Sequence, residues 1–115
     1  MSVEIYHNPR CSKSRQTLQI LQEQGVEPEV VEYLKTPPDK ATLKRILKML
    51  GLEPRQLMRT KEKEYQEQGL DDTSLSNEQL IDAMIATPKL IERPIVIKNG
   101  KAAIGRPPES VLEIL

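Results

Sequence analysis

The dipeptide Asn99-Gly100 constrains the fold of this chain more than any other short feature, because two β-favouring runs, Pro94–Lys98 and Lys101–Ile104, flank it. A two-residue turn between antiparallel strands needs positive φ at both central positions, which asparagine and glycine tolerate best. The sequence therefore predicts an antiparallel hairpin near the end of the chain.

A strand, a helix and a second strand are predicted at the start of the chain. Val3–Tyr6 favours a strand, and a helical hydrophobic period runs from about Cys11 to Gln24 and stops at Gly25. Glu29–Tyr33 is the next β-favouring run. This spacing suits a right-handed parallel β-α-β unit.

The middle of the chain is predicted to be helical. An amphipathic helix over residues 43–50 ends at Gly51, and Glu53–Gln68 favours two short helical pieces. Ser76 and Gln79 have the spacing of a capping box that begins a further helix.

A last helix, with Pro107 and Pro108 at its start, is predicted after the hairpin. The order β-α-β, helices, β-β-α predicts an α/β protein with a small mixed sheet: a thioredoxin-like fold with a helical insertion. At 115 residues we expect a single domain, with its core in residues 1–35 and 88–115 and the insertion at about 36–87.

Composition excludes several classes of function. Seventeen basic residues balance seventeen acidic ones, so no overall field favours nucleic acid or an anionic membrane as a partner. The N-terminus lacks a signal-peptide pattern, and no apolar run approaches the ~18 residues that span a bilayer. We therefore expect a cytoplasmic monomer with no metal site and no bound cofactor.

The stretch HNPRCSKSR at residues 7–15 holds the only cysteine and the only histidine of the chain. A single cysteine cannot form an internal disulfide. Cys11 lies where the strand turns into the helix, and the helix dipole and nearby Arg10, Lys13 and Arg15 favour a thiolate. The alternative for Cys11 is a small, buried and unreactive thiol.

Two neighbours complete the predicted catalytic group. The Ser14 hydroxyl is placed to donate a hydrogen bond to the Cys11 sulfur. His7 either stabilises the thiolate and moves a proton, or makes a structural hydrogen bond. Because backbone N–H groups at a helix start bind oxyanions, the thiolate is expected to lie beside a bound oxyanion.

With these residues in view, the chain resembles the glutaredoxin-linked arsenate reductases of the ArsC family, whose other branch is the Spx-type transcription regulators. The resemblance covers nearly the whole chain. It is carried by four segments: YHNPRCSKSR at 6–15, EYLKTPP at 32–38, LMRTKE at 57–62 and LIERPIVIKNGKAAIGRPPE at 90–109.

The resemblance implies a function for residues in three of these segments. Cys11 is the implied nucleophile, and Arg59, Arg93 and Arg106 are the implied ligands of the substrate oxyanion. The thioredoxin-like pattern also implies a cis peptide bond at Arg93-Pro94.

The implied chemistry is attack of the Cys11 thiolate on arsenate, followed by attack of glutathione on the enzyme-bound arsenic ester. The product is arsenite, and Cys11 is left in a mixed disulfide with glutathione. Without a second cysteine the chain cannot resolve that disulfide, so glutathione with glutaredoxin is the expected reductant.

Two alternatives stay open. Ser12-Lys13 stands where characterised arsenate reductases of the family tend to have Gly-Thr, which leaves a general glutathione-dependent thiol oxidoreductase as the second hypothesis. A Spx-like regulator that binds RNA polymerase is less well supported, because Ser14 occupies the place of its second cysteine.

Overall fold

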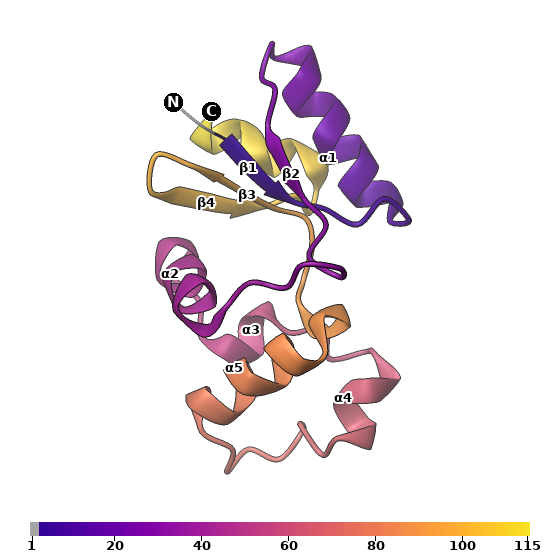
Figure 1. Cartoon of the computed structure of the whole chain (residues 1–115), viewed down its shortest axis with the longest axis vertical. Helices are drawn as coiled ribbons and strands as arrows, with labels where there is room; N and C mark the ends of the chain where they lie inside the picture. Colours follow the sequence, from indigo (N-terminus) through magenta and orange to yellow (C-terminus); the bar gives the residue numbers. More distant parts are fainter. Residues whose placement is uncertain (1–2) are drawn as a thin grey trace. The chain divides into compact units, whose positions relative to one another are not determined.

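The computed structural model describes residues 3–115, and the predicted hairpin and β-α-β unit share one sheet (Figure 1). Within these residues four strands form a mixed sheet in the order β2-β1-β3-β4. β1 pairs in parallel with β2 and antiparallel with β3, which pairs antiparallel with β4. The strands are β1 Val3–Tyr6, β2 Glu29–Val31, β3 Ile95–Lys98 and β4 Lys101–Ile104. The mixed α/β sheet of the predicted thioredoxin-like fold is confirmed.

The turn chemistry of the hairpin agrees with the prediction. Asn99 and Gly100 have φ angles of 52° and 74°, so both central residues lie in the left-handed region. The predicted strand Glu29–Tyr33 is shorter than expected and ends at Val31. From Glu32 the backbone bends away from β1, because the Glu32 carbonyl accepts the Lys35 and Thr36 N–H groups in a turn.

Two helices pack on the sheet. The α1 helix (Ser12–Glu23) and the 3-10 helix η2 (Pro108–Ile114) place Leu21 and Val111 against the sheet residues Val3, Ile5 and Val96. The predicted last helix forms, but it is a 3-10 helix and not the α-helix of the predicted β-β-α order. This segment instead makes tight i to i+3 hydrogen bonds, such as the one from the Ser110 N–H to the Pro107 oxygen.

The chain divides into two compact units. The first comprises the residues up to Thr36 together with Arg93–Leu115, and the second is Pro37–Glu92. The second unit holds the helical segment expected at about 36–87 and extends to Glu92. The second unit extends to Glu92 because segment 90–92 pairs with segment 57–59 through the Met58–Ile91 bridge.

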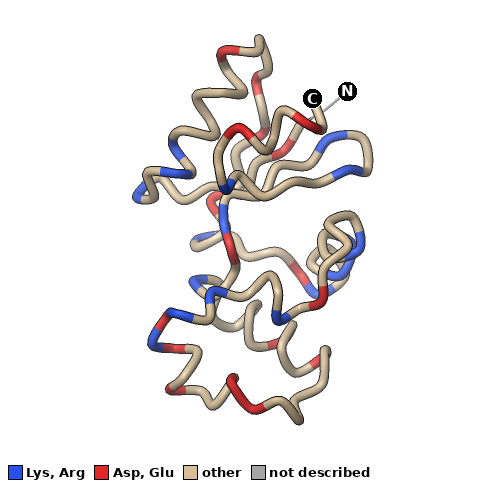
Figure 2. The backbone as a smooth tube through the Cα atoms, turned by 180° about the vertical axis from the view of Figure 1, so that it is seen from behind, with Lys and Arg blue, Asp and Glu red and all other residues tan. Residues whose placement is uncertain are grey.

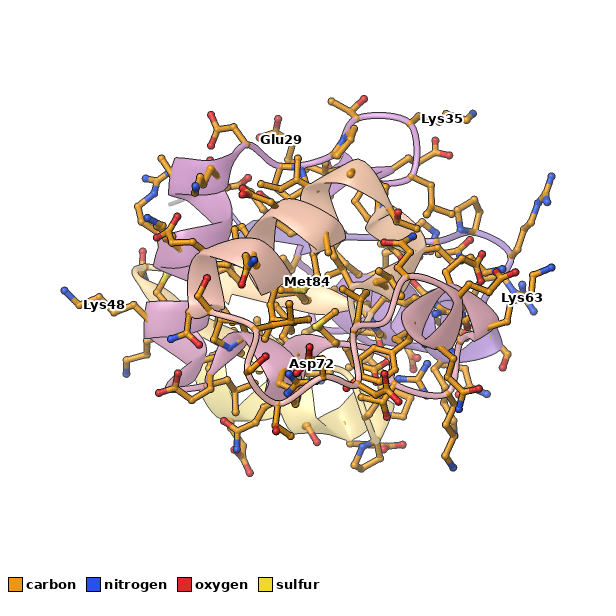
Figure 3. The ribbon with its side chains drawn as sticks, turned by 90° about the horizontal axis from the view of Figure 1, so that it is seen from below. Glu29, Lys35, Lys48, Lys63, Asp72 and Met84 are labelled. Carbon is orange, nitrogen blue, oxygen red and sulfur yellow. The ribbon has the colours of Figure 1, made fainter. Side chains whose placement is uncertain are left out.

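Short helices build the second unit around a buried aliphatic core. Asp39 caps the first of them by accepting the Thr42 N–H at 2.8 Å, and Gly51 ends it at φ 68°. Figure 3 shows Met84 inside this core and Lys48 pointing outward. The elements are α2 Lys40–Leu50, α3 Pro54–Leu57, α4 Lys63–Glu67, α5 Asn77–Ala86 and the 3-10 helix η1 Pro88–Leu90.

Charges of both signs are spread along the backbone of both units (Figure 2). Lys40 and Lys44 of α2, for example, pair with Glu78 of α5 at 2.5 and 2.6 Å. This interspersed pattern agrees with the neutral net charge of the sequence.

Candidate active site

Cys11 lies in the turn between the carboxyl end of β1 and α1. Its N–H donates to the Asn8 carbonyl at 3.0 Å, and the Asn8 side chain accepts the Arg10 N–H, also at 3.0 Å. With φ −94° and ψ 123°, Cys11 is the N-cap residue of α1, and its carbonyl accepts the Arg15 N–H. Cys11 is partly exposed, which disagrees with the alternative of a fully buried, unreactive cysteine.

His7 and Ser14 hold this turn from inside. The Ser14 hydroxyl is fully buried and lies 2.6 Å from His7 Nδ1, while it accepts the Asn8 N–H at 3.0 Å. Burial lowers the pKa of His7; the field of Glu32 opposes this shift and that of Arg15 adds to it. A neutral imidazole is therefore expected at neutral pH. The imidazole contacts the Ser14 hydroxyl.

The cations nearest to Cys11 in sequence are exposed. Arg10 and Lys13 lie on the surface, and Arg15 uses its guanidinium to donate to the Pro9 carbonyl at 2.9 Å. They contribute to the positive field around the turn. The structure describes no contact from them to the sulfur.

Arg106 contacts the thiol of Cys11. Its Nη2 lies 3.8 Å from Cys11 Sγ, and its Nε donates to the Arg93 carbonyl at 2.9 Å. The Arg93–Pro94 peptide bond is cis, as the resemblance implies, and so is Arg106–Pro107, which the sequence did not predict. The fold thus joins Cys11, Arg106 and the Arg93 backbone in the first unit.

Gly105 fixes the position of Arg106. Its N–H donates to the Pro94 carbonyl at 2.9 Å, and a Cβ at this position would lie 2.4 Å from Thr17 Oγ1. Thr17 is fully buried in α1 and donates to the Lys13 carbonyl at 2.8 Å. Sequence reasoning missed both residues. The available signal was a glycine directly before an Arg-Pro pair.

Arg59 belongs to the second unit. Its Nη1 lies 3.1 Å from Glu62 Oε1, and its Nε lies 3.7 Å from Glu92 Oε1. Sequence reasoning did not identify Glu62 and Glu92 as partners of Arg59.

Among residues 3–115 no group of three or more His, Cys, Asp or Glu side chains gathers as a metal site. None of the helices in that range is long and apolar enough to cross a bilayer.

Comparison with known proteins decides the family. Residues 6–114 match the sequence pattern of the ArsC family. The chain belongs to the ArsC family. An arsenate reductase of Neisseria meningitidis serogroup A is 52% identical over 98% of this chain and 97% of its own. The protein YfgD of Escherichia coli K12 is 66% identical over 98% of this chain and 96% of its own.

A solved ArsC-like structure confirms the fold of this family member. The arsenate reductase from Vibrio cholerae superposes with a TM-score of 0.98 and is 58% identical, covering 100% of this chain and 98% of its own. In this ArsC family member, Cys11 and Arg106 are in contact within one unit, whereas Arg59 is paired with acids in the other.

Proposed function

We propose that this protein is an oxidoreductase that reduces arsenate to arsenite, with Cys11 as the nucleophile. The contact between Arg106 and Cys11 at the start of α1 carries the proposal. The guanidinium of Arg106 lies 3.8 Å from the sulfur and is placed to bind an oxyanion next to it. Membership of a family whose members include arsenate reductases points to arsenic as the electrophile.

The proposed reaction starts with two substitutions at arsenic. The Cys11 thiolate forms an S–As bond to arsenate, and one arsenate oxygen leaves as water after protonation. Glutathione forms a second S–As bond in the same manner. Arg59, Arg93 and Arg106 are the proposed ligands that spread the negative charge of the oxyanion.

Reduction follows when the two sulfurs join. Formation of the S–S bond moves two electrons to arsenic, which leaves as arsenite, while the two thiols are oxidised to a Cys11–glutathione disulfide. The chain has no second cysteine to reverse this, so an outside thiol must attack the disulfide. We propose glutaredoxin with glutathione for this step, in the cytoplasm and with the protein as a monomer.

His7 and Ser14 are proposed to position the nucleophile. Ser14 accepts the Asn8 N–H and contacts His7 Nδ1, so it ties the first turn of α1 to the residues that follow β1. The proposed role of His7 is to orient Ser14, because a neutral imidazole adds no positive charge beside the thiolate.

One observation keeps a second function open. Ser12 and Lys13 are exposed in the first turn of α1, next to Cys11, and differ from the Gly-Thr expected for an arsenate-binding loop. A general glutathione-dependent thiol oxidoreductase would use the same thiol and arginines. A Spx-like switch is disfavoured because Ser14, in place of a second cysteine, is fully buried.

A coupled assay tests the proposal. Arsenate-dependent NADPH oxidation is measured with glutathione, glutaredoxin and glutathione reductase for the wild type, Cys11→Ser and Arg106→Ala. We expect Cys11→Ser to be inactive and Arg106→Ala to lose about ten- to a hundred-fold in kcat/KM, the range for a lost charge-assisted hydrogen bond. Arg45→Ala, an exposed change on α2, is the matched control and should keep wild-type activity.

Exchange with a model glutathione disulfide separates the two functions. A wild-type protein that exchanges readily with this disulfide, yet shows no arsenate-dependent rate, would refute arsenate reduction and support the thiol oxidoreductase.

A further inference from the structure

The guanidinium of Arg59 is held between carboxylates. Glu62 Oε1 lies 3.1 Å from Nη1, and Glu92 Oε1 lies 3.7 Å from Nε. Exposure of the three side chains is low, at 24% for Arg59, 19% for Glu62 and 26% for Glu92. An anion that approaches Arg59 therefore meets a cation already paired with acids.

Backbone pairing keeps this arrangement in register. Met58 and Ile91 form an antiparallel bridge, the Arg59 N–H donates to Leu90 O at 2.7 Å, and the Glu92 N–H donates to Leu57 O at 2.8 Å. The Glu62 N–H also donates to the Arg59 carbonyl at 3.1 Å. Both acids are thus fixed relative to Arg59 by main-chain bonds as well as by charge.

Glu62 differs from Glu92 because it has a second cation. Its Oε2 lies 3.5 Å from Lys89 Nζ, which is 3.2 Å from Glu64 Oε2 as well. If Glu62 releases Arg59, its carboxylate keeps Lys89 as a partner. Release therefore does not leave a half-buried charge unpaired, which would be the costly outcome.

We propose that Glu62 determines oxyanion affinity by competing with the substrate anion for the Arg59 guanidinium. This inference rests on the proposed function, in which Arg59 binds the oxyanion. The cluster of Arg59, Glu62, Glu64, Lys89 and Glu92 contains three carboxylates and two cations, so its charge does not attract anions in general. An anion gains at this site by taking over the N–H contact that Glu62 holds. The planar guanidinium favours an anion with several oxygens in this exchange, because it can donate two N–H groups to such an anion at once.

The test measures anion binding apart from turnover. Since the chain has one cysteine, alkylation by iodoacetamide gives one mass adduct, and a bound oxyanion should protect Cys11. The concentration of arsenate that halves the alkylation rate is measured without reductant, and phosphate serves as a second, non-reducible probe. KM and kcat for arsenate are then measured in the coupled assay.

Glu62→Gln should lower both the half-protecting concentration and the KM by about two- to five-fold, the range for removing a partly exposed ion pair. We expect kcat to change less than two-fold. Glu64→Gln is the matched control, because it removes the same charge from Lys89 without touching Arg59, and it should shift neither quantity by two-fold. Glu62→Asp, which keeps the charge but shortens the side chain, should give a smaller decrease in the same direction.

A double-mutant cycle shows whether Glu62 acts through Arg59. The effect of Glu62→Gln should vanish in an Arg59→Gln background. An unchanged or raised KM in Glu62→Gln, an equal effect of Glu64→Gln, or an effect that persists without Arg59 would each overturn the inference. Wild-type protein that is neither protected by arsenate nor active with it would instead refute the proposed function itself.

Discussion

The close packing behind Gly105 makes a strong prediction for the variant Gly105→Ala. Gly105 does not have the positive φ that disfavours alanine, so the backbone accepts the change. The added methyl group, however, would lie 2.4 Å from Thr17 Oγ1, 2.8 Å from Pro94 Cγ and 3.1 Å from Thr17 Cγ2. Distances below 3.0 Å require one of these neighbours to move.

Neither neighbour moves easily. Thr17 is fully buried and its hydroxyl is bonded to the Lys13 carbonyl, while Pro94 is a buried ring. Overpacking of this kind costs about 1 to 3 kcal/mol, and two contacts below 3.0 Å place Gly105→Ala towards the upper end. At roughly 4 °C per kcal/mol, the melting temperature should fall by about 4 to 12 °C.

Thermal and urea unfolding measure this loss, and a second substitution tests its cause. Thr17→Ala removes both threonine atoms that the methyl group would meet. The added cost of Gly105→Ala in that background should therefore fall by at least half. Equal costs in the two backgrounds, or wild-type stability of Gly105→Ala, would show that the steric reasoning is wrong. Activity should fall as well, because Arg106 follows Gly105 directly.

Two further predictions concern the turn that carries Cys11. Ser14→Ala should lower the free energy of unfolding by about 1 to 3 kcal/mol in urea titrations, because His7 Nδ1 and the Asn8 N–H both lose a buried partner. An unchanged midpoint would contradict the positioning role of Ser14. Because the pKa of His7 is lowered in the native state, the unfolded chain binds the proton first as the pH falls below about 6.5. Native stability should therefore decrease below this pH, and His7→Gln should show a weaker decrease over the same window in unfolding experiments at a series of pH values.

Local chemistry was predictable from the sequence. Asn99-Gly100 formed the expected hairpin, and Gly25 and Gly51 ended their helices at positive φ, because each feature depends on the conformation of neighbouring residues. The capping box of Ser76 and Gln79 formed for the same reason. The type of the last helix was not predictable, since the hydrophobic period barely separates a short α-helix from a 3-10 helix.

The candidate site was predictable only in part. The position of Cys11 at the start of a helix follows from adjacent residues, whereas Arg106 reaches it from the far end of the chain. Two residues so far apart in sequence cannot be recognised as neighbours unless a resemblance to a known family indicates it. The acids around Arg59 were hidden for a different reason, because Glu62 is an ordinary i to i+3 partner on a polar segment and Glu92 depends on the pairing of segments 57–59 and 90–92.

The antiparallel pairing of β1 with β3 has a consequence for how the chain folds. Val3–Tyr6 pairs with Ile95–Lys98, although the whole of Pro37–Glu92 separates them in sequence. Such a long loop closes late in folding, because its closure costs conformational entropy before the new contacts can stabilise it. The contacts within Pro37–Glu92 span much shorter stretches and can form first. We therefore expect the inserted helices to organise early and to shorten the search that unites the two halves of the sheet. Cys11 and Arg106, on opposite sides of that closure, would then meet only at the end of folding.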